Sequence, residues 1–327
     1  KGAVAVSGLT CYSVVQAVEE AGCTPIYLDI NKDDLHFGAS QLEAACKKNK
    51  INAVVVQHML GLPANIKAIT EVAKKYNVTI IEDLAHAAGA TYGGQRQLGT
   101  VAPYTVLSFG KDKALDVING GALIVRSGKS VEALPYRHVR FGEQLRDRLY
   151  PFISLLTRSL WPVGGKYIMA VALKTGLVVR SADGEIDATE IMPAWQAKLA
   201  LEQLDLLDTT VKHRQAIVGS YEKYLKVPIP KAALKTGASP IRLPLLVRNR
   251  DEIIETLGKS GYHALDIWYD TPVGPTRFYD RVAYPEKSCP VAVEVASSII
   301  NLPTHQRITK HDARRIASIV NKVAQYE

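Results

Sequence analysis

The sequence lacks the features of several protein classes. Its four cysteines, Cys11, Cys23, Cys46 and Cys289, are too few and too scattered for a disulfide framework. No pair of them has the C-x-x-C spacing of a zinc or redox site, and the chain contains no internal repeat and no low-complexity tract. These absences exclude disordered, collagen-like and disulfide-scaffold proteins, and they favour a reducing, cytoplasmic setting.

Long uninterrupted apolar runs are also absent. The most apolar region, residues 149–179, is interrupted by Arg158, Lys166 and Lys174. It therefore falls short of the roughly 18 consecutive apolar residues that a membrane-spanning helix needs. The first apolar stretch after Lys1 is short and does not have the layout of a signal peptide. We expect neither a membrane-spanning helix nor a targeting segment.

The charge of the chain is concentrated in one segment. The 327 residues are 47% hydrophobic and 22% charged, with 40 basic and 32 acidic side chains and a formal net charge of +8. Such a surplus can serve nucleic acids, anionic membranes or phosphorylated substrates. Residues 137–180 hold eight Lys or Arg and only two acids, Glu143 and Asp147. Because no recognised nucleic-acid motif is present, we expect no nucleic-acid partner.

Short β-branched runs alternate with helical patterns over the first 130 residues. The runs are PIYLD, AVVVQ, VTIIED, TVLSF and ALIVR. Between the second and third runs, Ile66, Ile69 and Val72 share one stripe of a helix predicted over residues 64–77. The alternation predicts βαβ units with right-handed crossovers. We therefore expect an α/β fold with a mostly parallel sheet flanked by helices, and ligands beyond the carboxyl ends of the strands.

The last third of the chain has a different organisation. A helix is predicted over residues 192–208 and continues as a helical stretch to about Tyr224. The strand RLPLLV and two more helices follow, and the second of these helices begins at Thr309. We expect a large domain over residues 1–200 and a smaller C-terminal α+β domain over residues 201–327.

Polar side chains follow two of the predicted strands. Asp83 ends the run IIED and His86 lies three residues later, whereas Ser108 ends the next run and Lys113 lies five residues later. A lysine can form a Schiff base, a buried carboxylate can keep a pyridine nitrogen protonated, and a hydroxyl can bind phosphate. Together these residue types suit pyridoxal 5'-phosphate (PLP). Taken singly, each also has an ordinary structural explanation, such as a turn, a cap or a solvated surface.

With these motifs the sequence resembles the DegT/StrS-type nucleotide-sugar aminotransferases, PLP enzymes with the PLP-transferase fold type I. The similar stretches are GLTCYSVVQAVEEAGCTPIYLDIN, HMLGLPANIKAITEVAKKYNVTIIEDLAHAAGATYGG, SFGKDKAL with the following Gly-Gly pair, and IMPAWQAKLALEQLDLLD. The block from Ile80 to Gly121 is the most specific, and the match around NLPTH is weaker.

The resemblance implies a role for each candidate residue. Lys113 would hold the cofactor covalently and move protons, and Asp83 would pair with its pyridinium nitrogen. His86 would contact the phenolic oxygen of the ring, and Ser108 would bind the phosphate. Related dehydratases carry a histidine in place of the lysine, so Lys113 favours transamination over dehydration.

The expected function is a cytoplasmic PLP-dependent sugar aminotransferase. It would move an amino group from an amino acid, glutamate, to a keto group of a nucleotide-linked sugar for polysaccharide or related amino-sugar biosynthesis. The resemblance further implies a homodimer with its active sites at the interface. No metal is expected.

Several positions depart from the pattern of the family. A phosphate-binding Gly-Thr pair would precede Lys1 or come from another chain, and Thr189 stands near the position of a phosphate-binding Asn. Ala194 replaces a Glu, and Cys11 replaces the aromatic residue that stacks on the cofactor, although Tyr12 is a potential substitute. These departures leave a second hypothesis open, a catalytically degenerate family member that acts as a binding or scaffolding subunit at a membrane.

The basic segment is longer than the corresponding connection in the family. We expect residues 137–185 to form a basic, apolar helical insertion. One face of its predicted helix carries Leu145, Leu149, Phe152, Leu156 and Leu160. Three roles stay open: packing on the domain or on the dimer partner, contact with an anionic membrane surface, and binding of the substrate diphosphate by arginines.

Overall fold

A computed structural model of the chain describes residues 2–126, 128, 137–160, 163–179, 190–262 and 267–326. Its α-helices are α1 (Tyr12–Glu20), α2 (Ala39–Lys48), α3 (Ile66–Tyr76), α4 (Phe141–Ser159), α5 (Gly165–Lys174), α6 (Ala194–Asp205), α7 (Leu207–Tyr224), α8 (Arg250–Lys259), α9 (Pro290–Ser298) and α10 (Lys310–Val323). Its strands outside the main sheet are β2 (Thr10–Cys11), β6 (Thr91–Tyr92), β7 (Arg96–Gln97), β10 (Arg137–His138), β11 (Glu190–Ile191), β12 (Arg242–Leu246), β13 (Val273–Gly274) and β14 (Ile299–Pro303).

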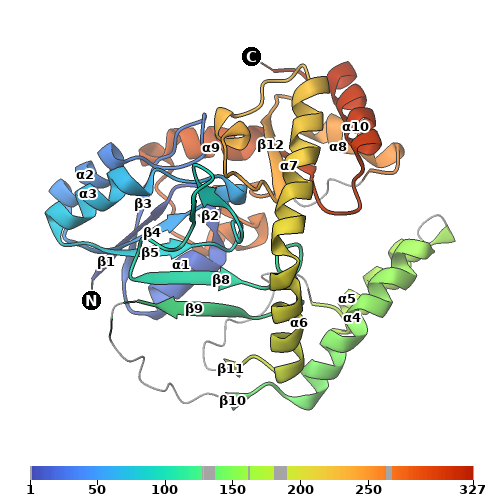
Figure 1. The fold of residues 1–327 in the computed structure, drawn as a ribbon, viewed down its shortest axis with the longest axis horizontal. Coiled ribbons are helices and arrows are strands. Elements are labelled where there is room, and N and C mark those ends of the chain that lie inside the picture. Colours follow the sequence, from blue (N-terminus) through green and yellow to red (C-terminus); the bar gives the residue numbers. More distant parts are fainter. Residues whose placement is uncertain are drawn as a thin grey trace.

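The main sheet has six strands in the order β3-β1-β4-β5-β8-β9 (Figure 1). Its strands are β1 (Ala3–Ser7), β3 (Thr24–Leu28), β4 (Ile51–Gln57), β5 (Thr79–Asp83), β8 (Tyr104–Ser108) and β9 (Gly121–Val125). The first five run parallel, which confirms the predicted α/β fold with a mostly parallel sheet. The run ALIVR, however, is an antiparallel edge strand, because β9 returns directly beside β8.

One strand of the main sheet was missing from the prediction. β1, with the sequence AVAVS, lies between β3 and β4 and has four buried residues. Its four alternating Ala and Val residues form a run that is too short to distinguish from other apolar stretches. The position of β1 inside the sheet arises from pairing with strands that follow it along the chain.

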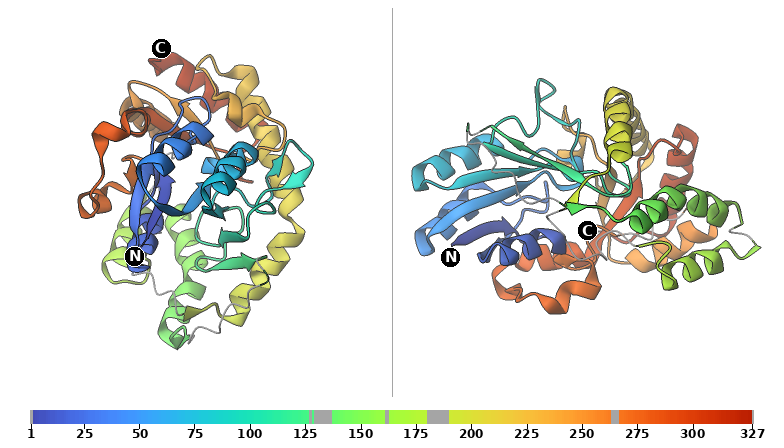
Figure 2. Two further views of the ribbon diagram at one scale, coloured as in Figure 1. Left: turned by 90° about the vertical axis from the view of Figure 1, so that its left-hand side faces the viewer. Right: turned by 90° about the horizontal axis from the view of Figure 1, so that it is seen from below.

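Helices cover both faces of the sheet (Figures 1 and 2). On one face, Val54 and Val56 of β4 share a core with Ile69 of α3 and with α2. On the other face, Val55 of the same strand packs with Val18 of α1. This alternation is the period of two that an extended strand imposes on its side chains. The helices thus cover β4 on both sides, whereas Leu123 and Ile124 of the edge strand β9 are exposed.

The C-terminal part forms a second layer around an antiparallel pair of strands, β12 and β14. α7, α8 and α10 pack against this pair, with Tyr221 of α7 and Leu243 of β12 fully buried. The predicted capping of α10 is confirmed, since the Thr309 hydroxyl accepts from the backbone N–H of Asp312 at 3.1 Å. The helix predicted over residues 192–208 is two helices, α6 and α7, which meet at Leu206.

The basic segment contains a helical hairpin of α4 and α5, which extends away from the main sheet (Figure 1). The helices approach closely at Gly165, where an added Cβ would lie 2.1 Å from the carbonyl oxygen of Thr157. Within residues 137–160 and 163–179, the described part of this segment, the structure contains these two helices. None of the helices described in the structure is long and apolar enough to cross a membrane.

Candidate active site

The candidate residues predicted from the sequence lie at the ends of two neighbouring strands or just after them. Asp83 is the last residue of β5 and Ser108 is the last residue of β8. Because β5 and β8 are parallel neighbours, both residues lie at the same edge of the sheet. The chain then turns after β8, where the backbone N–H of Lys113 donates to the carbonyl of Gly110 at 3.2 Å.

Steric crowding explains why glycines occupy positions 120 and 121 beside β9. Gly120 has a φ of +98°, and a Cβ there would lie 2.8 Å from Sδ of Met192. A Cβ on Gly121 would lie 2.4 Å from the carbonyl oxygen of Leu107 on β8. Only glycine fits both positions without moving the backbone, so the pair allows β9 to approach β8 beside the turn that carries Lys113.

An indole ring connects Lys113 with His86. Nζ of Lys113 lies 4.3 Å from the ring centroid of Trp268. The His86 ring stacks on Trp268, with centroids 4.6 Å apart and planes at 7°. The guanidinium carbon of Arg242 lies 4.0 Å from the same indole centroid. Trp268 and Arg242 were not predicted as site residues, because they lie far along the chain from Lys113 and belong to none of the motifs above.

The hydrogen bonds and the burial of His86 indicate its protonation state and its tautomer. Nδ1 accepts from the backbone N–H of Leu60 at 3.2 Å, and Nε2 lies 3.4 Å from the hydroxyl of Tyr269. Burial, together with the charges of Lys113 and Arg242, lowers the pKa of His86 well below its usual value. His86 is therefore neutral, and since Nδ1 accepts, Nε2 carries the proton and points to Tyr269.

The Asp83 carboxylate is buried and held by two hydrogen bonds. Oδ1 accepts from the backbone N–H of Ala85 at 2.8 Å, and Oδ2 accepts from Nε2 of Gln57 at 3.1 Å. The amide oxygen of Gln57 in turn accepts from the hydroxyl of Thr10. Burial raises the pKa of Asp83, although these hydrogen bonds and the charge of Lys113 act in the opposite direction. A cation at the open side of this carboxylate would be stabilised.

The environment of Lys113 disfavours the charged form of its amine relative to a lysine in water. Burial lowers the pKa of Lys113, while the nearby Cys11 and Asp83 partly raise it again. With the described residues, the amine forms no hydrogen bond or close ion pair, and its contact is the face of Trp268. A neutral amine without a hydrogen-bond partner is the form that attacks a carbonyl group.

These properties meet the chemical requirements of PLP. The buried carboxylate of Asp83 matches a protonated pyridine nitrogen, and the amine of Lys113 is available for a covalent bond to an aldehyde. The backbone N–H of Gly110 donates to the Ser108 hydroxyl oxygen at 3.4 Å, so these two polar groups lie side by side after β8. The charge of Lys113 acts on both Asp83 and His86, and Ser108 lies at the start of the turn that carries Lys113.

The residues that depart from the family pattern lie in different surroundings. Cys11 interacts electrostatically with Lys113, whereas the Tyr12 ring stacks on Phe278 with centroids 4.7 Å apart. The aromatic ring beside Lys113 is thus that of Trp268. Ala194 is the exposed first residue of α6, and Thr189 lies outside the described residues.

A buried carboxylate next to Asp83 anchors the loop before β8. Oε1 of Glu82 accepts from the backbone N–H groups of Val101 and Ala102, at 2.9 and 2.7 Å. Oε2 accepts from the N–H of Gly99 at 2.9 Å and from the Tyr92 hydroxyl, and it lies 3.3 Å from Nε2 of His58. Burial alone would raise the pKa of Glu82, but these hydrogen bonds outweigh it and lower the pKa to about 2.

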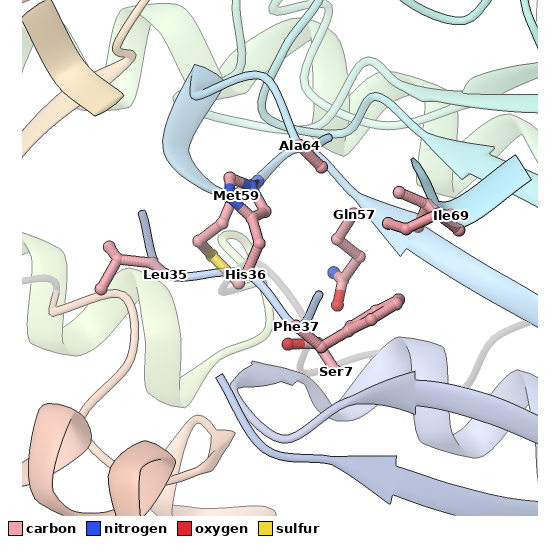
Figure 3. A pocket seen from close by; sticks show the side chains of 9 residues that line it. Ser7, Leu35, His36, Phe37, Gln57, Met59, Ala64 and Ile69 are labelled. Atoms are coloured by element: carbon pink, nitrogen blue, oxygen red, sulfur yellow. Dashed lines mark hydrogen bonds between the residues drawn. The ribbon is translucent and has the colours of Figure 1, made fainter. Parts of the chain in front are cut away.

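A small cavity adjoins Gln57 (Figure 3). Its lining is mostly apolar and consists of Ser7, Leu35, His36, Phe37, Val56, Gln57, Met59, Ala64 and Ile69. The space is too narrow for a water molecule. We therefore regard it as a packing gap behind the site, with no ligand-binding role.

Comparisons with known proteins agree with this geometry. The GDP-perosamine synthase of Caulobacter vibrioides is 27% identical over 331 residues, which cover 98% of this chain and 78% of that protein. DesV from S. venezuelae has a TM-score of 0.73 and 24% identity, covering 98% of this chain and 78% of its own. The PLP form of Spr1654 from Streptococcus pneumoniae has a TM-score of 0.71 and 19% identity, covering 98% and 81%. The two structures show the fold, PLP-transferase fold type I.

The family assignment rests on most of the chain. The model of the DegT/DnrJ/EryC1/StrS aminotransferase family matches residues 1–145 and 184–321. Its first match contains Asp83, His86, Ser108 and Lys113, and it ends within α4. The chain belongs to the DegT/DnrJ/EryC1/StrS aminotransferase family.

Proposed function

We propose that this aminotransferase moves an amino group from glutamate to a keto group of a nucleotide-linked sugar, with Lys113 as its catalytic residue. The observation that carries the proposal is the Lys113 amine, which has a lowered pKa, lies 4.3 Å from Trp268 and acts by its charge on the buried Asp83. This combination of amine and carboxylate suits amino-group exchange on PLP, the cofactor of the family.

PLP supplies, when bound, an electron sink for the carbon atom that exchanges its amino group. Lys113 would hold the cofactor covalently and, once released, its neutral amine would take a proton from the substrate carbon and return it. Asp83 would keep the pyridine nitrogen protonated. Ser108 and the N–H of Gly110 would bind the phosphate. His86, neutral and protonated on Nε2, would donate a hydrogen bond to the ring oxygen after turning from Tyr269.

The proposed acceptor substrate follows from the sequence relative. The Caulobacter vibrioides protein is named a GDP-perosamine synthase, so its product is an amino sugar linked to GDP. The likeness extends over 98% of this chain. We extend the substrate class to this chain and leave the nucleotide open. Such products serve polysaccharide and related amino-sugar biosynthesis.

The proposal includes the organisation of the molecule. We keep a large domain over residues 1–200 and a small domain over residues 201–327, and we propose a cytoplasmic homodimer. Support for the dimer comes from exposed leucines on α6 in the part that the family model matches, namely Leu199, Leu201 and Leu204. A peripheral contact with an anionic membrane through residues 137–180 completes the proposal.

Amino transfer is tested with the purified protein, PLP and ¹⁵N-labelled glutamate. We expect the label to appear in the product of at least one of a set of GDP-, UDP- and dTDP-linked keto-sugars, as measured by mass spectrometry. The reverse half-reaction should convert the matching amino sugar to its keto form. If PLP is bound through Lys113 but no keto-sugar takes up the label, the proposed substrate class is wrong. If PLP is not bound at all, the degenerate scaffolding alternative, which these findings do not otherwise support, gains ground.

The hydrogen bond from Gln57 to Asp83 predicts a role in positioning. Gln57→Leu removes one charge-assisted hydrogen bond from a buried carboxylate, so we expect the dissociation constant for PLP to rise about tenfold or more. PLP titration followed by absorbance measures it, and thermal unfolding of the cofactor-free protein reports on the fold. Thr10→Val, which leaves the bond between Gln57 and Asp83 in place, should have a smaller effect. Equal PLP affinity in Gln57→Leu and the wild type would contradict the role.

A further inference from the structure

The α4–α5 hairpin presents its apolar residues to the outside. The buried residues of α4 are polar or small, namely Asp147, Ser154 and Thr157. Its large apolar side chains are exposed, with Phe152 at 71% and Leu155 at 65%. The other exposed large hydrophobic residues of the hairpin are Phe141, Leu145, Leu149, Leu156, Leu160, Val163, Tyr167, Val171 and Leu177. This arrangement is the reverse of an ordinary surface helix.

The predicted apolar stripe is therefore not covered by the described residues of this chain. The sequence analysis left open that Leu145, Leu149, Phe152, Leu156 and Leu160 pack on their own domain. In the structure all five side chains are exposed. The expectation that they pack on their own domain is therefore wrong. An apolar face of this extent marks an interaction site.

The exposed charged side chains of the hairpin are basic in the part that the structure describes. Arg148, Arg158, Lys166 and Lys174 are exposed. The two acids between residues 141 and 179 are engaged within the protein. The carboxylate of Glu143 accepts from the backbone N–H of Arg140, and Asp147 is buried and accepts from Asn119 at 2.7 Å. The exposed face thus combines apolar and basic groups and matches an anionic, partly apolar partner.

Most of the hairpin lies outside the part of the chain that matches the family model. The family model matches residues 1–145 and 184–321 and omits residues 146–183, which hold nearly all of the exposed hairpin face. A dimer interface common to the family does not need these residues, whereas the exposed leucines of α6 lie within the matched part. A second copy of the chain is thus a poorer match for the hairpin than a lipid surface.

The hairpin is also attached to the turn that carries Lys113. The Lys111 amine donates to the carbonyl of Val179 and lies 4.1 Å from the ring centroid of Tyr150. Asn119, at the other end of the same loop, donates to Asp147 of α4. A surface that receives the hairpin would therefore lie next to the candidate active site.

We propose that the α4–α5 hairpin docks the enzyme on an anionic membrane surface, with Phe152 and Leu155 entering the lipid and Arg158 and Lys166 contacting the headgroups. This inference rests on the peripheral location in the proposed function and is independent of the amino-transfer reaction. The docked enzyme would hold its active site next to the membrane surface. The hairpin lies on the surface and does not span the bilayer.

The test uses the full chain loaded with PLP and vesicles of phosphatidylcholine with or without phosphatidylglycerol. We expect cosedimentation with the anionic vesicles at low salt, and weaker binding at high salt or without phosphatidylglycerol. The double variant Phe152→Ser, Leu155→Ser should reduce the partition coefficient at least about tenfold. Arg158→Gln and Lys166→Gln should each reduce it about fivefold.

Controls separate this inference from its alternatives. Leu234→Ser, an exposed leucine outside the hairpin, should bind vesicles as the wild type does. Light scattering and amino transfer are measured on every variant. The inference is overturned if the wild type ignores anionic vesicles, if the double variant binds them equally well, or if the double variant changes a dimer to a monomer. Loss of sugar-nucleotide affinity in Arg158→Gln, with vesicle binding unchanged, would instead assign that arginine to the diphosphate. Absence of amino transfer with normal vesicle binding would contradict the proposed function alone.

Discussion

Lys113→Ala is expected to abolish covalent attachment of PLP and to lower amino transfer at least about a thousandfold. The reason is that one amine performs two tasks, the covalent bond to the cofactor and the proton transfer at the substrate carbon. The amine makes no hydrogen bond with the described residues, so its removal should leave the midpoint of thermal unfolding nearly unchanged.

The measurement for Lys113→Ala is borohydride reduction of the PLP-loaded protein, followed by peptide mass spectrometry. The wild type should carry a phosphopyridoxyl group on Lys113 and the variant should carry none. Lys111→Ala is the matched control, because its amine binds the carbonyl of Val179 and points toward Tyr150. A reduced adduct on another lysine of Lys113→Ala, with amino transfer retained, would refute the assignment.

Glu82→Gln is expected to reduce the free energy of unfolding by about 3–5 kcal/mol. The carboxylate is fully buried and each of its oxygens accepts hydrogen bonds, from Val101 and Ala102 on one side and from Gly99 and Tyr92 on the other. A glutamine side chain replaces one of the two carboxylate oxygens with an NH₂ group. Whichever oxygen is replaced, this NH₂ group faces protein N–H or O–H groups that also donate. At least two buried N–H or O–H groups would lose their acceptor.

The effect of Glu82→Gln should depend on pH in a defined direction. The folded protein lowers the pKa of Glu82 from 4.5 to about 2. A lowered pKa stabilises the folded state above pH 4.5, and this contribution disappears as the pH falls from 4.5 to about 2. The difference in unfolding midpoint between wild type and variant should therefore be largest near neutral pH and shrink in acid.

Thermal unfolding between pH 7 and pH 3, followed by circular dichroism, measures this difference. Glu255→Gln is the control, because that carboxylate is exposed and pairs with Lys259 one helical turn away. Its effect should be small at every pH. A difference for Glu82→Gln that stays constant or grows toward pH 3 would contradict the ionised state of the buried carboxylate.

The chemistry at the sheet edge was predictable because it depends on local patterns. Asp83 and Ser108 end apolar runs, and Lys113 follows the second run at a short distance, so parallel pairing alone places all three at one edge. By contrast, Trp268 gave no signal in the sequence, whereas Gln57 ends the run AVVVQ and had the same positional signal as Asp83 and Ser108, which was left unused. Trp268 approaches Lys113 only after the C-terminal part has folded back, where the amide of Asn301 accepts from the backbone N–H of Trp268 at 2.6 Å.

The sequence by itself determined the strands that end in Asp83 and Ser108, the amphipathic helix of the basic segment and the family, because periodicity and motifs are local properties. The tertiary structure alone decided which residues surround these groups and which face of a helix is covered. The spacing of Leu149, Phe152 and Leu156 predicts one apolar stripe, yet it carries no information on what lies opposite the stripe. In this chain the polar side of α4 packs inward and the apolar side is exposed, because the neighbours that bury a helix come from distant parts of the sequence.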